Sequence, residues 1–155
     1  MKYIVDSNIY INFLLKRINI LTDFEVLQVS AYEKLDFREI ILPEYILFEL
    51  SNFFQFILPS RYYLKGKTAE INLMQEAGFD LIRDIQDKAI LKINNRMEIE
   101  TTYKEYLSLR TSTFKKLSIV DIFLATQALD NDFTLITNDK MLIKYAKSIG
   151  ANFMV

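Results

Sequence analysis

Short apolar runs alternate with amphipathic stretches along most of this chain of 155 residues. Apolar runs predict strands at Tyr3–Val5, Glu39–Leu42, Ala89–Ile93, Phe133–Thr137 and Asn152–Val155. Apolar positions at helical spacing predict helices over residues 8–16, 23–34, 44–58, 68–77, 80–87, 98–110, 118–130 and 140–148. Short apolar strands that alternate with helices are typical of a parallel sheet covered on both faces. The expected fold class is therefore α/β.

Proline and glycine predict where some of these elements end. Pro43 suits the first turn of the helix that follows the second strand. Pro59–Lys67 reads as a loop, because it opens on proline and is mostly polar and aromatic. Gly78 is expected to cap the helix that begins at Thr68. Residues 79–95 have the weakest pattern of apolar and polar positions, and the role of residues 60–97 stays open.

Composition narrows the class of protein. The chain is 51% hydrophobic with only 3 glycines and 2 prolines, which favours one dense domain over residues 1–155. It has no cysteine, so a disulfide framework is excluded and the cytoplasm is the default location. No apolar run approaches the roughly 18 residues of a membrane span. The net charge of −1 does not indicate nucleic-acid binding, so any such binding would use local basic patches.

Four carboxylates stand in apolar surroundings. Asp6 and Asp139 follow predicted strands, where ligands of parallel sheets gather, and Glu49 and Asp121 lie within apolar helices. An ionised carboxylate taken out of water costs several kcal/mol unless a positive charge meets it. With no histidine or cysteine in the chain, oxygen ligands favour Mg²⁺ or Mn²⁺ over Zn²⁺.

Three of the four acids also have purely structural explanations. Asp6 and Asp139 could each cap the helix that follows. Ser118 and Asp121 stand three residues apart and match the capping box, in which the two side chains bond each other's backbone. Taken singly, these three acids do not require a metal.

Glu49 has no such explanation. A helical projection from Glu44 places Glu49 about 140° away from the polar stripe that contains Gln55. Glutamate is almost never buried without a partner, and no lysine or arginine occurs between Ile40 and Ser60. Either a distant cationic side chain or a metal ion should therefore meet Glu49.

The motifs around these acids resemble those of a known family. In order they are Val5-Asp-Ser-Asn-Ile, Pro43-Glu-Tyr-Ile-Leu-Phe-Glu-Leu-Ser-Asn-Phe-Phe, Leu117-Ser-Ile-Val-Asp-Ile-Phe-Leu-Ala-Thr-Gln-Ala-Leu and Leu135-Ile-Thr-Asn-Asp. Their order and spacing are similar to those of PIN-domain metal-dependent ribonucleases, of the kind found in VapC-type toxins and related prokaryotic nucleases. The resemblance covers nearly the whole chain.

This resemblance implies a three-layer α/β/α fold with a central parallel sheet of about four or five strands. It also implies cleavage of RNA with Mg²⁺ or Mn²⁺ held by the four acids. The implied catalytic and metal residues are Asp6, Glu49, Asp121 and Asp139. Asn8, Ser118 and Thr137 would orient ligands or water from behind them. Capping and turn chemistry explain these three polar residues equally well.

Basic and aromatic residues suggest partners. Arg110, Lys115 and Lys116 precede the helix at Ser118 and are candidates for RNA contacts. The loop residues 61–67, with Arg61, Tyr62, Tyr63, Lys65 and Lys67, could grip phosphate and stack bases, although solvated loop charge is the more common role. Surplus surface aromatics could equally mark a homodimer or antitoxin interface.

Other functions remain in competition. A HAD-type hydrolase would have Asp-x-Asp at the first strand end, where Asn8 takes the second position, and the acid and lysine pattern of a response receiver is missing. A non-enzymatic PIN-like scaffold that binds RNA or protein is the main alternative, but such members should lose some of the acids. A PIN nuclease of RNA maturation or decay is a further alternative to a toxin.

Overall fold

The structure, a computed structural model, describes residues 1–17, 36–62 and 68–155 of the chain. Five strands form one sheet in the order β3-β2-β1-β4-β5. They are β1 Tyr3–Val5, β2 Ile40–Pro43, β3 Ile90–Lys92, β4 Thr134–Ile136 and β5 Asn152–Met154. Every neighbouring pair is parallel. The predicted parallel sheet of four or five strands is therefore confirmed.

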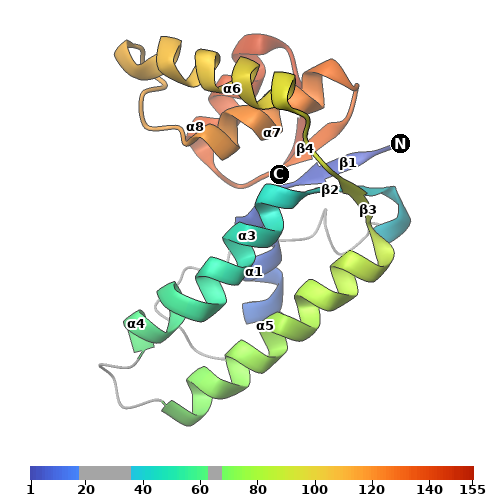
Figure 1. Cartoon of the computed structure of the whole chain (residues 1–155), viewed down its shortest axis with the longest axis vertical. Coiled ribbons are helices and arrows are strands. Elements are labelled where there is room, and N and C mark those ends of the chain that lie inside the picture. Colours follow the sequence, from blue (N-terminus) through green and yellow to red (C-terminus); the bar gives the residue numbers. More distant parts are fainter. Residues whose placement is uncertain (18–35, 63–67) are drawn as a thin grey trace.

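Helices cover the sheet on both sides (Figure 1). One group consists of α1 Ser7–Arg17, α3 Glu44–Asn52, α4 Leu58–Tyr62 and α5 Thr68–Lys88. The other group consists of α6 Arg96–Ser108, α7 Ile119–Asp130 and α8 Lys140–Ile149, and the short 3₁₀ turns are η1 Phe37–Glu39 and η4 Leu109–Thr111. The expected three-layer α/β/α fold is confirmed. The helix predicted over residues 23–34 lies outside the described residues.

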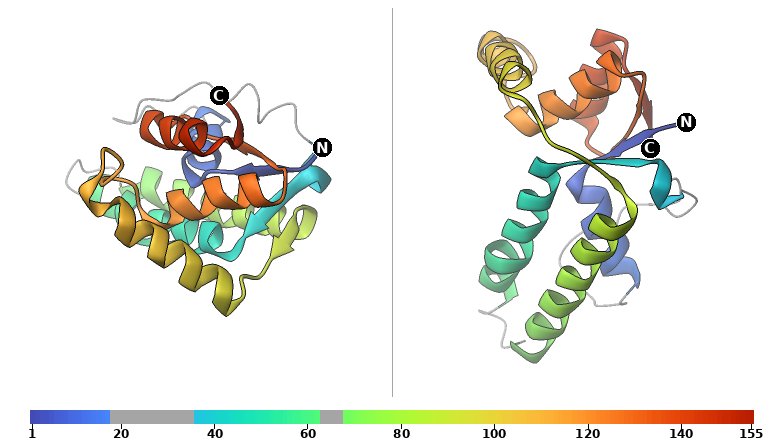
Figure 2. Two further views of the ribbon diagram at one scale, coloured as in Figure 1. Left: turned by 90° about the horizontal axis from the view of Figure 1, so that it is seen from above. Right: turned by 45° about the vertical axis from the view of Figure 1, so that its right-hand side comes forward.

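The core lies between the sheet and the two helix groups. Ile4, Leu42 and Leu135 are fully buried in neighbouring strands. Beyond the sheet, the ring of Tyr45 in α3 meets the ring of Phe123 in α7 edge to face, with centroids 5.3 Å apart. This contact holds together the two helices that carry Glu49 and Asp121, although they belong to opposite layers (Figure 2, right).

The helix that begins at Glu44 does not end at Leu58 as predicted. It continues through a π-helical turn, η2 Phe53–Ile57, into α4. In this wider turn the Leu58 N–H bonds to the carbonyl of Phe53. The next carbonyl in that register, on Phe54, would need an N–H from Pro59, which has none. Gln75 Nε2 donates to it instead, at 3.0 Å.

The prediction of a loop from Pro59 is therefore wrong for residues 59–62, which are helical. The π turn and the Gln75 side chain of α5 make up for the backbone hydrogen bond that the proline cannot donate. The side chains of residues 61–67, and with them the predicted basic and aromatic loop, lie outside what the structure describes.

The predicted helix end at Gly78 is also wrong. α5 runs unbroken from Thr68 to Lys88, so the helices predicted over 68–77 and 80–87 are one. Gly78 is buried, and a Cβ built on it would lie 2.5 Å from the ring of Phe54. The glycine allows α5 to approach η2 closely. By contrast, Gly150 has a φ of 81° and does end a helix, α8.

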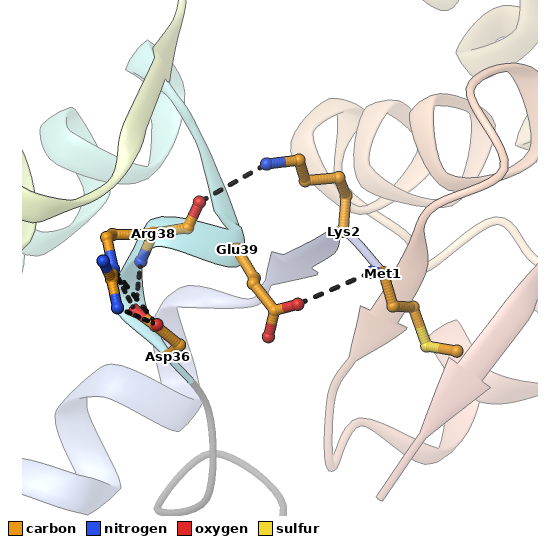
Figure 3. Close-up of polar contacts among 5 residues, drawn as sticks. All are labelled: Met1, Lys2, Asp36, Arg38 and Glu39. Atoms are coloured by element: carbon orange, nitrogen blue, oxygen red, sulfur yellow. Dashed lines mark hydrogen bonds and ion pairs between the residues drawn. The ribbon is translucent and has the colours of Figure 1, made fainter.

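The amino ends of β1 and β2 are joined by exposed polar contacts (Figure 3). The Met1 amino group lies 3.5 Å from Glu39 Oε1, and Lys2 Nζ donates to the Arg38 carbonyl at 3.4 Å. Arg38 in turn pairs with Asp36 at 2.8 Å, which lowers the pKa of that carboxyl group. Exposed ion pairs contribute little to stability, so these contacts mainly align the strands at the edge away from the acids. No helix in the described ranges is long and apolar enough to cross a bilayer.

Candidate active site

Asp6 lies at the carboxyl end of β1, between β2 and β4, and its side chain is buried. Its backbone N–H donates to the Ile136 carbonyl of β4 at 3.0 Å. Its Oδ2 accepts a hydrogen bond from Thr137 Oγ1 at 2.8 Å, whereas the bonds to Oδ1 from Asn8 N and Ser7 Oγ are longer, 3.4 and 3.5 Å. The shortest contact of this carboxylate therefore comes from a neighbouring strand and not from the helix that it could cap.

Burial dominates the protonation of Asp6. It raises the pKa of the carboxyl group from 3.8 to about 7, although the hydrogen bond from Thr137 lowers it. The nearby negative charges of Asp121 and Glu49 raise the pKa further. At neutral pH this group therefore favours either a proton or a cation.

Glu49 is half-buried on α3, which agrees with its predicted orientation away from solvent. Burial raises its pKa, a side-chain hydrogen bond with Ser7 lowers it, and the charge of Asp121 raises it. Ser7 thus contacts both Asp6 and Glu49. Sequence reasoning did not select Ser7, and the available signal was its place directly after Asp6 in the first motif.

The capping box of Ser118 and Asp121 is confirmed. Ser118 N donates to Asp121 Oδ2 at 2.7 Å, and Asp121 N donates to Ser118 Oγ at 3.1 Å. Burial raises the pKa of Asp121, the bonds with Ser118 lower it, and the charge of Asp139 raises it. On Asp121 the two bonds of the capping box use only Oδ2 and the backbone N–H, which allows this residue to cap α7 and to contribute Oδ1 elsewhere.

Asp139 is exposed and caps α8. Its Oδ1 accepts from Met141 N at 2.7 Å and from Leu142 N at 2.8 Å, so the structural explanation of this residue is correct. Its own N–H donates to Thr137 Oγ1 at 3.0 Å. Thr137, which is fully buried, therefore contacts both Asp6 and Asp139.

The four carboxylates repel one another electrostatically. The charges of Glu49 and Asp121 raise the pKa of Asp6, the charge of Asp121 raises that of Glu49, and the charge of Asp139 raises that of Asp121. Among the described residues, no three acidic side chains are grouped closely enough to hold a metal ion by themselves. Within those same residues, none of the four is in an ion pair with lysine or arginine.

The donor set nevertheless fits a hard divalent cation in kind. It consists of oxygen atoms alone, and it contains a buried carboxyl group, Asp6, that lacks a counter-charge in the described structure. Mg²⁺ is usually bound by one or two carboxylates and keeps several of its waters. Residues that are neighbours but not mutually in contact suit that kind of binding.

The other predicted residues occupy different surroundings. The side chain of Asn8 is exposed, and only its backbone N–H contacts Asp6. Arg110 lies over the ring of Tyr106, 5.1 Å from its centroid, and donates to the Lys115 carbonyl at 2.8 Å. Lys115 and Lys116 are exposed just before Ser118. All three residues are exposed, and Arg110 in addition holds the turn before α7 through the Lys115 carbonyl.

A family model described as "PIN domain" matches residues 3–148. The chain belongs to the PIN-domain family. PIN domains are generally nucleases that use divalent metal ions, so a nuclease in the broad sense is supported for this member. The matched residues include all four acidic motifs.

Comparison with solved structures gives fold likeness only. Among six matching chains is one described as a domain of a functionally unknown protein from Methanocaldococcus jannaschii. It is 17% identical, with a TM-score of 0.47, over 99% of this PIN domain and 89% of that chain. No curated protein matches the sequence.

Proposed function

We propose that this PIN domain is an endoribonuclease that depends on Mg²⁺ or Mn²⁺, with Asp6, Glu49, Asp121 and Asp139 as its acidic site. The observation that carries the proposal is the state of Asp6. It is 3% exposed, has a pKa raised to about 7, and lies near two further carboxylates, Glu49 and Asp121. A group in this setting requires a proton or a cation, and its family supports the cation.

The four acids would have different roles in binding the metal ion. Asp6 and Asp121 are the principal ligands, and Glu49 is a ligand or contacts a second ion. Asp139 acts through water, because its Oδ1 is already bonded by two backbone N–H groups of α8. A divalent ion bound there supplies positive charge to the phosphate and activates water. Thr137 holds Asp6 Oδ2 in place, and Ser7 lies between Asp6 and Glu49.

RNA is the proposed substrate, and the proposal is tested by incubating purified protein with RNA that has unpaired loops, in Mg²⁺, in Mn²⁺ or in EDTA. The wild type should cleave in either metal and not in EDTA, and Asp6→Asn should lose cleavage. Asp80→Asn, which alters an exposed carboxylate paired with Arg83 on α5, is the control and should cleave normally. Undiminished cleavage by Asp6→Asn would exclude this site assignment.

A toxin of a toxin–antitoxin pair is the biological role we propose, acting in the cytoplasm. Growth arrest on expression, relieved by Asp6→Asn, would support it over a nuclease of RNA maturation or decay. Absence of cleavage in every metal, with RNA or protein binding retained, would favour the non-enzymatic scaffold.

A homodimer is proposed from the surface of α6. Ile99, Tyr103 and Leu107 recur every fourth residue and are 41%, 51% and 51% exposed. Such a stripe is suited to pairing with a second copy or to binding an antitoxin. Light scattering of the purified chain, alone and after Leu107→Glu, distinguishes the monomer from the dimer.

A further inference from the structure

Two phenylalanines of the continuous helix that carries Glu49 are exposed to solvent. Phe48 is 71% and Phe56 is 66% exposed, whereas Phe53 and Phe54 between them are buried. Burying a phenylalanine side chain normally stabilises a protein by roughly 1.5–3 kcal/mol, so two exposed rings forgo that gain. Because both rings lie on the helix that carries Glu49, and Phe48 directly precedes it, they are candidates to contact a ligand of the site.

The two rings belong to one stripe of the continuous helix formed by α3 and η2. Phe48, Asn52 and Phe56 recur every fourth residue, and Asn52 is exposed as well. Glu49 directly follows Phe48 and precedes Phe56 by two turns. A rise of about 1.5 Å per residue places the two ring positions about 12 Å apart along the axis, too far for one flat base to stack on both.

The π turn aligns the second ring with the first. In an uninterrupted α-helix the eight steps from Phe48 to Phe56 would rotate the second ring about 80° away. The wider turn of η2 rotates less at each residue, so Phe56 returns toward the side of Phe48. π turns inside helices are frequent at functional sites, and this one follows Glu49 by four residues.

The same turn is fixed from behind. Gln75 Nε2 donates to the Phe54 carbonyl at 3.0 Å, and the Phe54 ring packs against the bare Cα of Gly78. Phe56 is therefore presented on a backbone that α5 holds in place. A fixed aromatic surface loses little entropy when a ligand stacks on it.

We propose that Phe48 and Phe56 each stack on one nucleobase and thereby hold a single-stranded RNA across Glu49, with its backbone at the acids. Stacking on aromatic side chains tolerates every base and is a general means of binding single strands. The inference rests on the proposed function for the cleavage step only. It names the residues of this chain that position the substrate.

Polar neighbours favour a nucleic acid over a protein as the ligand. Asn52 and Gln55 are exposed between the two rings, so the rings do not form the contiguous apolar patch that marks many protein interfaces. Lys115, Lys116 and Lys140 are exposed close in sequence to Ser118 and Asp139, at the starts of α7 and α8 in the opposite helix layer. Aromatic rings on one layer and cations on the other suit a strand that has bases and phosphates.

The test is binding of a fluorescein-labelled single-stranded RNA of about 10 nucleotides, measured by anisotropy in EDTA. Asp6→Asn serves as the parent, so that binding is separated from cleavage. Phe48→Leu and Phe56→Leu should each raise Kd about 5- to 100-fold, the range for loss of one stacked base. Phe48→Tyr, which keeps a ring, should restore binding. The control Phe79→Leu removes a ring on α5 that is 46% exposed and should bind like the parent.

Two further measurements separate stacking from charge and from protein contacts. A duplex of the same sequence should bind equally to the parent and to both leucine variants, because its bases already stack on one another. The dependence of Kd on salt should be the same for Phe48→Leu as for the parent, since no phosphate contact is removed.

Unchanged single-strand affinity in both leucine variants, or absence of single-strand binding by the parent, overturns the inference. A change in oligomeric state with unchanged RNA affinity also overturns it, in favour of a protein interface. If RNA binding depends on the rings but no metal supports cleavage, the proposed function fails and the inference stands. Normal cleavage with the same KM in both leucine variants overturns the inference alone.

Discussion

Thr137 Oγ1 donates a hydrogen bond of 2.8 Å to Asp6 Oδ2 across 131 positions of the sequence. Both side chains are buried, at 0% and 3% exposure. The same hydroxyl accepts the backbone N–H of Asp139 at 3.0 Å. One threonine at the end of β4 therefore fixes the carboxylate at the end of β1 and the start of α8.

Thr137→Val keeps the shape of this residue and removes its hydroxyl. We expect the variant to lose about 1–3 kcal/mol of unfolding free energy at neutral pH, because a buried carboxylate oxygen and the Asp139 N–H both lose their partner. The pKa of Asp6 should rise further, since the bond from Thr137 lowers it. Urea denaturation measures the first effect. Thr137→Ser retains the hydroxyl and should recover most of the loss, and equal stability of all three proteins would contradict the prediction.

Asp6 should make the metal-free protein less stable as pH rises. Its pKa is 3.8 when unfolded and about 7 when folded, so between these values the folded state keeps a proton that the unfolded state has released. Stability therefore falls as pH rises from about 4 to about 7 and stays low above that, by up to about 4 kcal/mol. Raised pKa values at Glu49 and Asp121 act in the same direction.

Asp6→Asn removes this titration. In EDTA the variant should be more stable than the wild type near pH 8, and the difference should vanish near pH 4. Urea denaturation of both proteins across this pH range gives the difference directly. Mn²⁺ should stabilise the wild type near pH 8 and have less effect on the variant. A difference that does not depend on pH would show that Asp6 titrates normally.

Local patterns predicted most of the framework. The five strands and the starts of α1, α3 and α7, each to within one residue, follow from apolar runs and from proline or capping residues, which act over a few positions. The half-burial of Glu49 followed from helical spacing alone. These features are set by neighbours in sequence, which is why sequence reasoning reached them.

Errors arose where distant contacts override local preference. Pro59 and Gly78 are strong helix-ending signals, yet both lie within helices, because Gln75 and Phe54 belong to partner helices that no local pattern reveals. The meeting of Asp6 with Thr137 likewise depends on the register that pairs Val5 with Ile136. The family resemblance placed Thr137 among the residues behind the acids, but neither it nor the spacing of residues predicted the bond to Asp6.

Gly78→Ala tests the close approach of α5 to the π turn. The added methyl would lie 2.5 Å from the Phe54 ring, so we expect a loss of about 1–3 kcal/mol of unfolding free energy, even though alanine favours helix more than glycine. Adding Phe54→Leu should recover part of that loss, and a double-mutant cycle by urea denaturation measures the coupling. A more stable Gly78→Ala would mean that helix propensity outweighs the clash.

Lys115→Gln and Lys116→Gln test whether the exposed turn before α7 contacts phosphate. Arg110 holds this turn through the Lys115 carbonyl, while both lysine side chains remain exposed. Each cation that meets a phosphate of a single strand should contribute about 0.7 to the slope of log K against log salt. The double variant, made in Asp6→Asn, should therefore bind single-stranded RNA with a slope smaller by about 1.4. Lys88→Gln is the control. This lysine lies at the carboxyl end of α5, paired with Asp84, and its replacement should leave the slope unchanged. If the slope of the double variant equals that of its parent, the two lysines are solvated surface charges and the RNA backbone follows another path to the acids.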